Sequence, residues 1–392
     1  MSGERCCIIR RSYYPAETHL RRNAETLAAA GYEVDVICLR GPGEPAREVV
    51  DGVRVYRLPL RTRRAGLPLY VMDYGGFFAL AAATVGWLHL RHPYAVVEAD
   101  SMPDALAFAG LVPRLAGARL ILYLFESMPE LWAQKQGVPM THWSVRLLRW
   151  QERVSCAVAD AIICCHEMAR NVLVQHGVPE QKVTAVLNVP DERMFHRALR
   201  AHERRGHELR LVQHGTITEN YGIQVVLEAI RLLGPQHRVH FDIVGQGEYR
   251  PVLEALARRL GVEEQVEFHG FVTRERLMEL LARADIGVVP MLFEYQSPNK
   301  MFEFVALGVP VIASDRRTFR QHFSDDEVLY FRTGDAGDLA RAIAWAIAHP
   351  RGMEERAGRA WERYQEYRWQ VMKERYLGVY DLLVRQAGRG MS

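Results

Sequence analysis

The sequence predicts an α/β fold with two doubly wound parallel sheets, each in its own domain, facing a central cleft. Apolar strand-like runs alternate with helical segments over the first 165 residues, and a second cycle of the same kind runs from Leu209 to Ala313. This alternation is typical of parallel strands with helices on both faces. Ligands of such folds bind beyond the carboxyl ends of the strands, so we expect the site in the cleft.

The first cycle opens with a strand, a helix and a strand. An apolar run at 6–10 precedes a helical face over 20–28, and Glu33–Leu39 is rich in β-formers. The pair Asp51-Gly52 between two valine-rich runs predicts a hairpin. The elements expected next are a strand at 96–97, a helix over 103–115, a strand over 119–124, a helix over 144–158 and a strand over 161–165.

The second cycle has sharper boundaries. Its expected strands are 209–213, 239–244, 266–268, 286–289 and 309–313, and its expected helices are 223–233, 249–260, 277–283 and 301–306. The segment 191–208 is charged and lacks an apolar period, as a linker would. The sequence therefore predicts an N-terminal domain over 1–190, a linker over 191–208 and a second domain over 209–365.

Composition narrows the class of protein. Of 392 residues, 49% are hydrophobic and 25% are charged, which excludes a disordered or fibrous chain, and a net charge of +3 argues against a nucleic-acid partner. The six cysteines form no C-x-x-C pair and predict buried thiols in a reducing compartment. The longest uncharged run, 74–90, falls short of the ~20 residues of a membrane-spanning helix. We therefore expect a cytoplasmic protein.

The most informative motif lies between residues 297 and 312. Ser297-Pro298-Asn299 precedes a helical segment, and proline favours the first helical turn. The N–H groups of that turn, with Lys300 beside them, would form an anion site. Glu303 lies on the same helix face as Lys300 and could accept hydrogen bonds from two ribose hydroxyls. A surface ion pair between the two is the alternative.

Two glycine-containing loops follow strands of the second cycle. Gly245 and Gly247 would let a phosphate approach backbone N–H groups, although a tight turn without a ligand explains them equally well. Gly215 and Thr216 lie in a loop at the end of the first strand, where they would face the cleft. Capping of the next helix by a neighbouring polar residue is the alternative for that loop.

The first half offers a carboxylate at the corresponding place. Glu126 follows the strand 119–124, and Glu130 lies four residues further on. Carboxylates at this position are candidates for substrate binding or proton transfer, while a helix cap is the alternative. Arg21 and Arg22 could bind a diphosphate, although solvated arginines are common in this arginine-rich chain.

A basic stretch next to an apolar one predicts contact with a membrane surface over 54–90. Five arginines fall between 54 and 64 without an acid, and the apolar run 75–88 follows. The alternative is a buried helix beside a solvated basic loop.

Taken in order, these motifs resemble the retaining nucleotide-sugar glycosyltransferases of family 4, which have the GT-B fold with two Rossmann-like domains. The resemblance rests on four segments: Val244–Glu248, Val266–Phe271, Ala284–Pro290 and Ser297–Ile312. It implies transfer of a sugar from a nucleoside-diphosphate sugar, with retention of configuration, to a glycan or lipid-linked acceptor. Surface polysaccharide or glycoconjugate synthesis would be the setting, without a metal or cofactor.

The resemblance also implies roles for residues. Glu303 would bind the donor ribose, Gly215 and Thr216 would lie against the diphosphate, and the segment 269–271, which ends at Phe271, would frame the base. The loop 295–299 would face the donor sugar, with Lys300 and Glu126 as further catalytic candidates. The segment 366–392 would be a helix that crosses back to the first domain.

The sequence departs from the family pattern at four positions: Phe125, Thr216, Tyr221 and Tyr295. These departures keep two alternatives open, namely a nucleotide-sugar epimerase or hydrolase of the same fold, and a catalytically inactive partner subunit. An NAD-dependent oxidoreductase is disfavoured because Gly245-x-Gly247 lacks the third glycine of the dinucleotide motif.

Overall fold

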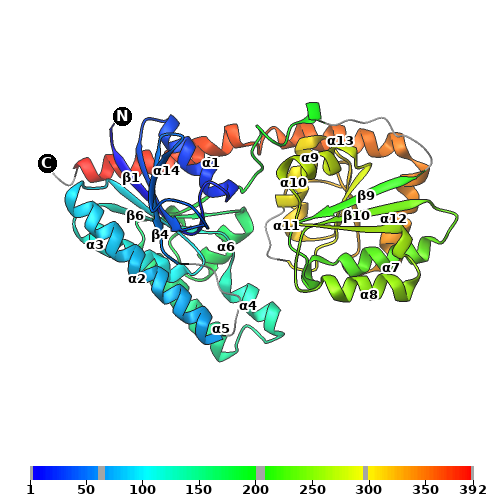
Figure 1. Cartoon of the computed structure of the whole chain (residues 1–392), viewed down its shortest axis with the longest axis horizontal. Helices are drawn as coiled ribbons and strands as arrows, with labels where there is room; N and C mark the ends of the chain where they lie inside the picture. The colour runs from blue at the N-terminus through cyan, green and yellow to red at the C-terminus, as the bar shows by residue number, and fades with distance from the viewer. Residues whose placement is uncertain (1–2, 61–66, 200–207, 295–298, 390–392) are drawn as a thin grey trace. The chain divides into compact units, whose positions relative to one another are not determined.

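The computed structural model describes residues 3–60, 67–199, 208–294 and 299–389. The chain divides into two compact units, an N-terminal unit of Met1–Asn188 with Gln370–Ser392, and a C-terminal unit of Val189–Trp369. The sequence placed the corresponding boundaries at 190 and 366. Both units are α/β, and each contains one sheet with helices on both faces (Figure 1).

The sheet of the N-terminal unit has eight strands in the order β3-β4-β2-β1-β5-β6-β7-β8. All neighbours pair in parallel except β3 and β4, which form the expected hairpin with Asp51 at φ 50° and Gly52 at φ 81°. The strands are β1 (Arg5–Tyr13), β2 (Glu33–Leu39), β3 (Arg47–Val50), β4 (Val53–Leu58), β5 (Val96–Asp100), β6 (Arg119–Leu124), β7 (Ala161–Cys164) and β8 (Val183–Ala185).

Helices of the N-terminal unit cover both faces of its sheet. One face packs against α2, α5 and α6, and its core includes Phe77, Leu122 and Cys156; α1 and α14 supply buried residues elsewhere in the unit, such as Leu20 and Tyr380. The helices are α1 (Thr18–Ala29), α2 (Leu67–Arg91), η1 (Asp104–Gly110), α3 (Leu111–Leu115), α4 (Met128–Gln136), α5 (Trp143–Val158), α6 (Glu167–Gln175), η2 (Glu180–Lys182) and α14 (Trp369–Arg389). All six cysteines are buried and none forms a disulfide, as the sequence predicted.

The segment 103–115 differs from the single helix that we expected. It forms the 3₁₀ helix η1 followed by the short helix α3, joined at Gly110. A Cβ atom at Gly110 would lie 2.6 Å from Leu120 Cδ1 of β6, so only glycine lets the chain pass this close to the sheet. The close approach of Gly110 to β6 sets the position at which the two pieces meet.

The last helix belongs to the N-terminal unit. Figure 1 shows α14, in red, alongside the blue N-terminal elements. Its Tyr376 and Tyr380 hydroxyls each donate a hydrogen bond to the fully buried Glu98 carboxyl group of β5, and Tyr32 donates to Asp381. Burial raises the pKa of Glu98 well above its ordinary value. Two hydroxyl donors therefore anchor this helix to the centre of the sheet.

The sheet of the C-terminal unit has six parallel strands in the order β11-β10-β9-β12-β13-β14. Numbered from β9, this is the 3-2-1-4-5-6 order of dinucleotide-binding folds, with its switch point between β9 and β12. The strands are β9 (Leu209–His214), β10 (Val239–Val244), β11 (Val266–Gly270), β12 (Ile286–Val289), β13 (Val311–Ser314) and β14 (Leu329–Phe331).

Helices again cover both faces of this sheet. Helices α7, α8 and α12 share one apolar core with the strands, whereas α9 and α10 contact β9, β12 and β13. The helices are η3 (Arg197–Leu199), η4 (Glu219–Tyr221), α7 (Ile223–Leu233), α8 (Arg250–Leu260), η5 (Glu263–Gln265), α9 (Arg274–Arg283), α10 (Asn299–Leu307), α11 (Arg317–Arg320), α12 (Ala336–Ala348) and α13 (Pro350–Tyr364).

Candidate functional site

The carboxyl ends of β9 and β12 form the switch point of the C-terminal sheet. His214 ends β9 and Gly215 follows it, and Pro290 follows β12. The β9 loop folds over towards β12, where Leu292 N–H donates to the Asn220 carbonyl at 2.9 Å. Gly222, at φ 70°, has the Pro290 carbonyl oxygen where a Cβ would lie, at 1.8 Å, so no other residue fits there. This is the edge at which we expected a ligand.

Backbone hydrogen bonds join the loops that follow β9, β10 and β11. Gly215 N–H donates to the Val244 carbonyl at 2.8 Å, Ile217 N–H to Gln246 at 2.9 Å, and Gly245 N–H to Gly270 at 2.9 Å. The pairing of the strands thus continues into the loops. These loops form one connected backbone surface at the carboxyl end of the sheet.

Gly245 and Gly247 serve this loop packing. A Cβ atom at Gly245 would lie 1.9 Å from the Gly215 carbonyl oxygen, and one at Gly247 would lie 1.9 Å from that of Ile217. The Gly245 N–H is already used within the protein. The close approach of backbone to backbone accounts for both glycines, which supports the tight-turn interpretation of this motif.

Helix α10 carries Lys300 and Glu303 beside this surface. Its position depends on Gly287 of β12, where a Cβ atom would lie 2.4 Å from the ring of Phe304. The absence of a side chain at Gly287 lets Phe304 rest on the strand. The first residues of α10 are thereby held close to Gly215.

The Lys300 ammonium is buried without an anion. Its Nζ lies 3.3 Å from the centre of the Tyr221 ring, and a Cβ atom on Gly215 would lie 2.6 Å from Cε. Among the residues that the structure describes, none accepts a hydrogen bond from Nζ. Burial lowers the pKa of Lys300 to about 7, while Glu303 opposes that shift. Among the described residues, this charge is stabilised by contact with the face of Tyr221 and by the nearby Glu303 carboxylate.

Glu303 lies next to a histidine that the sequence did not single out. Its Oε2 is 3.0 Å from Nε2 of His214, the last residue of β9, and the His214 ring packs edge-on against Phe304 at 5.3 Å. The Glu303 side chain is 23% exposed, so part of its carboxylate can accept hydrogen bonds from a ligand. His214 precedes Gly215 directly, and its place at the end of a strand was the available signal. Tyr221 was visible only as a departure from the family pattern.

The other predicted residues of this unit lie nearby to differing degrees. Thr216 is exposed in the β9 loop, and Asn299 begins α10. Phe271 follows β11 and is 82% exposed. Ser297 and Pro298 lie outside the described residues. The structure therefore brings Gly215, Lys300 and Glu303 together.

In the N-terminal unit, Glu126 and Glu130 have different surroundings. Glu126 follows β6, and burial raises its pKa to about 7. Glu130 is buried on α4, where it accepts a hydrogen bond from Ser127 Oγ at 2.6 Å and lies 3.2 Å from His176 Nε2. Glu130 therefore has structural contacts within the unit, whereas Glu126 remains a candidate for proton transfer. Of the two arginines, Arg21 pairs with Glu25, and Arg22 is buried.

The first arginines of the predicted membrane-contact region form ion pairs within the protein. Arg54 binds Asp35 and Glu33, and the buried Arg57 binds Glu44 and Glu48. Arg61, Arg63 and Arg64 lie outside the described residues. The described part of α2 still exposes apolar side chains, which are Met72, Leu80, Trp87 and Leu90.

Helix α5 has an exposed apolar stripe that we did not predict from the sequence. Trp143, Leu147 and Trp150 are 70%, 54% and 62% exposed and are spaced so as to share one helix face. Arg146 and Arg149 lie between them. Their i, i+4, i+7 spacing is visible in the sequence, but this spacing is typical of a buried helix face and so does not indicate an exposed one. Within the described ranges, no helix has both the length and the apolar character that a membrane crossing requires.

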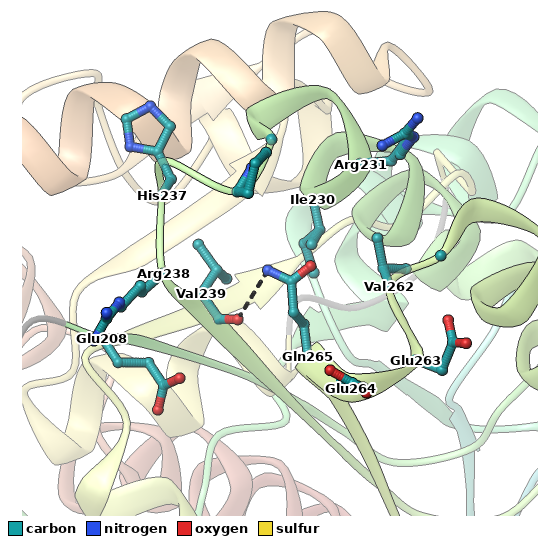
Figure 2. A pocket seen from close by; sticks show the side chains of 13 residues that line it. Glu208, Ile230, Arg231, His237, Arg238, Val239, Val262, Glu263, Glu264 and Gln265 are labelled. Carbon is teal, nitrogen blue, oxygen red and sulfur yellow. Dashed lines mark hydrogen bonds between the residues drawn. The ribbon is translucent and has the colours of Figure 1, made fainter.

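Figure 2 shows a pocket at the amino ends of strands of the C-terminal sheet, opposite the carboxyl ends described above. It has a volume of about 760 Å³ and is lined by residues at the amino ends of β9, β10 and β11, among them Glu208, Val239 and Gln265. Gln265 Nε2 donates to the Val239 carbonyl at 3.4 Å across its wall. None of the predicted site residues lines it.

Two family models match the chain. Residues 16–188 match the glycosyl transferase 4-like domain, and residues 208–349 match the glycosyl transferases group 1. A glycosyltransferase of Methanocaldococcus jannaschii, uncharacterized, is 23% identical over 394 residues, which is 95% of each chain.

Solved structures share the fold. Sucrose-phosphate synthase from Thermosynechococcus elongatus superposes with a TM-score of 0.80 at 18% identity, over 98% of this chain and 100% of that one. Anabaena HepE in complex with UDP-glucose has a TM-score of 0.72 at 15% identity, over 96% of this chain and 99% of that one. The predicted fold is confirmed, and the chain belongs to the GT-B glycosyltransferases with a family 4-like N-terminal domain and a group 1 C-terminal domain.

Proposed function

We propose that this glycosyltransferase transfers a sugar from a nucleoside-diphosphate sugar with retention of configuration. The buried, unpaired ammonium of Lys300 beside Gly215 carries the proposal. A buried charge without a partner costs free energy, and a bound anion would offset that cost. A diphosphate placed between Lys300 and the first turn of α10 would receive both the ammonium and the helix N–H groups.

This arrangement favours departure of the diphosphate. As the bond between the anomeric carbon and the diphosphate oxygen breaks, negative charge grows on that oxygen, and the acceptor oxygen bonds to the same carbon. A fixed ammonium at the leaving group stabilises the growing charge. A diphosphate would also raise the pKa of Lys300 from about 7 and keep it protonated. We assign charge neutralisation to these groups of the chain, without a catalytic metal.

Two carboxylates complete the proposal. Glu303, held beside His214 and partly exposed, would accept hydrogen bonds from the donor ribose. Glu126, with a pKa of about 7, would take the proton of the acceptor hydroxyl, since a group with a pKa near the working pH can both accept and release a proton. Gly215 and Thr216 would lie against the diphosphate, and Phe271 would lie near the base.

We further propose a lipid-linked acceptor in polysaccharide or glycoconjugate synthesis, reached from the cytoplasmic surface of a membrane. Exposed tryptophans next to arginines favour the interface between lipid headgroups and acyl chains. The stripe Trp143, Leu147 and Trp150 with Arg146 and Arg149 supports this, as do the exposed residues of α2. Sedimentation with vesicles of anionic lipid should bind the wild type and lose Trp143→Ser/Trp150→Ser, whereas equal binding of both proteins would contradict the proposal.

Thermal unfolding with UDP, GDP, ADP and CMP in millimolar excess tests the donor site. A nucleotide present at ~100 times its dissociation constant should add about 2.7 kcal/mol of stability. We expect one nucleoside diphosphate to raise the melting temperature by a few degrees, and Glu303→Ala to abolish that shift while Glu228→Ala, an exposed carboxylate on α7, preserves it. A folded protein that responds to none of them would contradict the donor site.

Product analysis then identifies the reaction. Incubation with the donor that carries the stabilising base, with and without a lipid-linked acceptor, should yield a glycosylated acceptor of unchanged anomeric configuration. Free sugar in the absence of acceptor would indicate a hydrolase, and an altered nucleotide sugar would indicate an epimerase.

A further inference from the structure

We propose that the edge of the C-terminal sheet contains a binding site for a divalent transition-metal ion, with zinc as the best match. His240 and Asp242 of β10 and Glu267 of β11 would be its ligands, and His269 would position Asp242. Its three ligands are not among the residues that we assign to the donor, and the proposal does not depend on the proposed reaction.

The sheet places the four side chains together. His240 and Asp242 are two residues apart on β10, and Glu267 and His269 are two residues apart on β11. Side chains two apart on a strand point to the same face. Parallel pairing puts Asp242 opposite Glu267. All four therefore project from one face of two adjacent strands.

The distances suit a metal ion. His240 Nε2 lies 3.4 Å from Asp242 Oδ1 and 3.7 Å from Glu267 Oε2, and one atom from each of the three residues falls within 4.8 Å of the others. Tetrahedral zinc with bonds of ~2.0–2.1 Å separates its ligand atoms by about 3.3 Å. The distance from His240 to Glu267 exceeds that value by a few tenths of an ångström, and the exposed Glu267 side chain can move to bring the three ligand atoms around one ion.

The donors are those that zinc prefers. Imidazole nitrogen and carboxylate oxygen both bind Zn²⁺, and three such protein ligands with an open fourth position are typical of zinc sites. Two carboxylates would neutralise the charge of the ion. Three protein ligands leave a fourth position for water, and Glu267, with a side chain that is 58% exposed, opens the site to solvent.

His269 supports Asp242 from behind. Its Nε2 lies 2.6 Å from Asp242 Oδ1, and its Nδ1 lies 3.4 Å from Glu267 Oε1. Hydrogen bonds from neighbouring groups orient metal-ligating carboxylates in this way. His240 Nε2 points to the same oxygen, so two ring nitrogens converge on one carboxylate atom.

Bound metal would fasten the edge strand to its neighbour. β11 ends at Gly270, whose carbonyl accepts the hydrogen bond from Gly245 N–H. A metal that bridges β10 and β11 would therefore also restrain the loops at the carboxyl end of the sheet. We expect metal to raise the melting temperature of the protein.

Metal uptake by the full chain tests the site. Protein stripped with a chelator is dialysed against Zn²⁺ or Co²⁺ and counted by elemental analysis, and the visible spectrum of the Co²⁺ form reports its coordination. We expect one equivalent per chain, a raised melting temperature, and loss of both in His240→Gln and Glu267→Gln. His237→Gln and Glu264→Gln, each three residues earlier and outside the cluster, are the matched controls and should bind like the wild type.

His269→Gln distinguishes a positioning role from a ligand role. It should bind one equivalent about 10- to 100-fold more weakly, as loss of an outer partner does. Glu267 is exposed, so Glu267→Gln tests the site even if His240→Gln fails to fold. No uptake by the wild type, or equal uptake by Glu267→Gln, would overturn the proposal.

Discussion

Two buried cations, one in each unit, have opposite surroundings. His176 of the N-terminal unit lies 2.6 Å from Glu152 and 3.2 Å from Glu130, and these carboxylates raise its pKa to about 9. Lys300 of the C-terminal unit has no acceptor among the described residues, and burial lowers its pKa to about 7. The protein therefore favours the protonated form of His176 and disfavours the protonated form of Lys300.

The difference separates structure from function. His176 joins α4 and α5 to the end of α6, and its partners satisfy it completely. Lys300 is stabilised by the face of Tyr221 and by the charge of Glu303, and no described residue accepts a hydrogen bond from its ammonium. We infer that Lys300 is positioned for the diphosphate of the proposed donor.

Removal of the paired cation should have the largest effect. His176→Ala leaves Glu130 and Glu152 buried without their partner, and loss of one member of a buried pair costs about 3–5 kcal/mol. Urea unfolding followed by circular dichroism should show this loss in the N-terminal unit. His349→Ala, on an exposed histidine, should change stability by less than about 0.5 kcal/mol. Equal stability of His176→Ala and the wild type would remove the contrast.

Removal of the unpaired cation should act in the opposite direction. Lys300→Met relieves a buried charge and should raise the stability of the protein without ligand by about 1 kcal/mol or more. It should also weaken binding of the nucleoside diphosphate by about 10- to 100-fold, since hydrogen bonds to charged groups contribute ~1.5–3 kcal/mol. Thermal unfolding and calorimetric titration measure the two effects, with the exposed Lys135→Met as control. A destabilised Lys300→Met that binds nucleotide normally would contradict both.

The pH dependence of these two variants sharpens the comparison. The raised pKa of His176 gives stability that is complete below about 6.5 and lost as pH rises through about 9. The stability deficit of His176→Ala should therefore shrink over that range. The lowered pKa of Lys300 gives a penalty that is complete below about 7 and vanishes towards about 10.5. The gain of Lys300→Met should shrink likewise, and pH-independent differences in either variant would show that the shifts are absent.

The smallest effect belongs to an exposed residue of the same loop. Thr216→Ala should change stability by less than about 0.5 kcal/mol, because Thr216 is exposed. If Thr216 contacts the diphosphate, Thr216→Ala should bind the nucleoside diphosphate no more than about tenfold more weakly than the wild type, which corresponds to the loss of one neutral hydrogen bond. A loss of affinity as large as that of Lys300→Met would shift the site towards the β9 loop.

Strands and helices were predictable because their patterns are local. The bounds of β2, β6, α7, β10 and β12 agree with the sequence prediction, since each is an apolar run between clear turn residues. The break at Gly110 was not predictable, because it depends on contact with Leu120 of a later strand. The prediction from helical periodicity therefore gave one continuous helix over 103–115.

The site was predictable where it lies on one element. Lys300 and Glu303 share α10, and their spacing is visible in the sequence. His214 and Tyr221 reach them from other segments, and the Asp242–Glu267 pairing depends on strand register. Register is set by the packed sheet, so those contacts could not be inferred from spacing within one strand.

The attachment of α14 has a consequence for the order of synthesis. Glu98 leaves the ribosome 278 residues before Tyr376, which donates to it. At about 5–20 residues per second, this corresponds to a wait of about 15–55 seconds. Throughout that time the nascent N-terminal unit has a central strand whose carboxyl group lacks both tyrosine donors. The C-terminal unit, whose residues are contiguous, can complete its own core first, so the half of the chain made earliest is finished last.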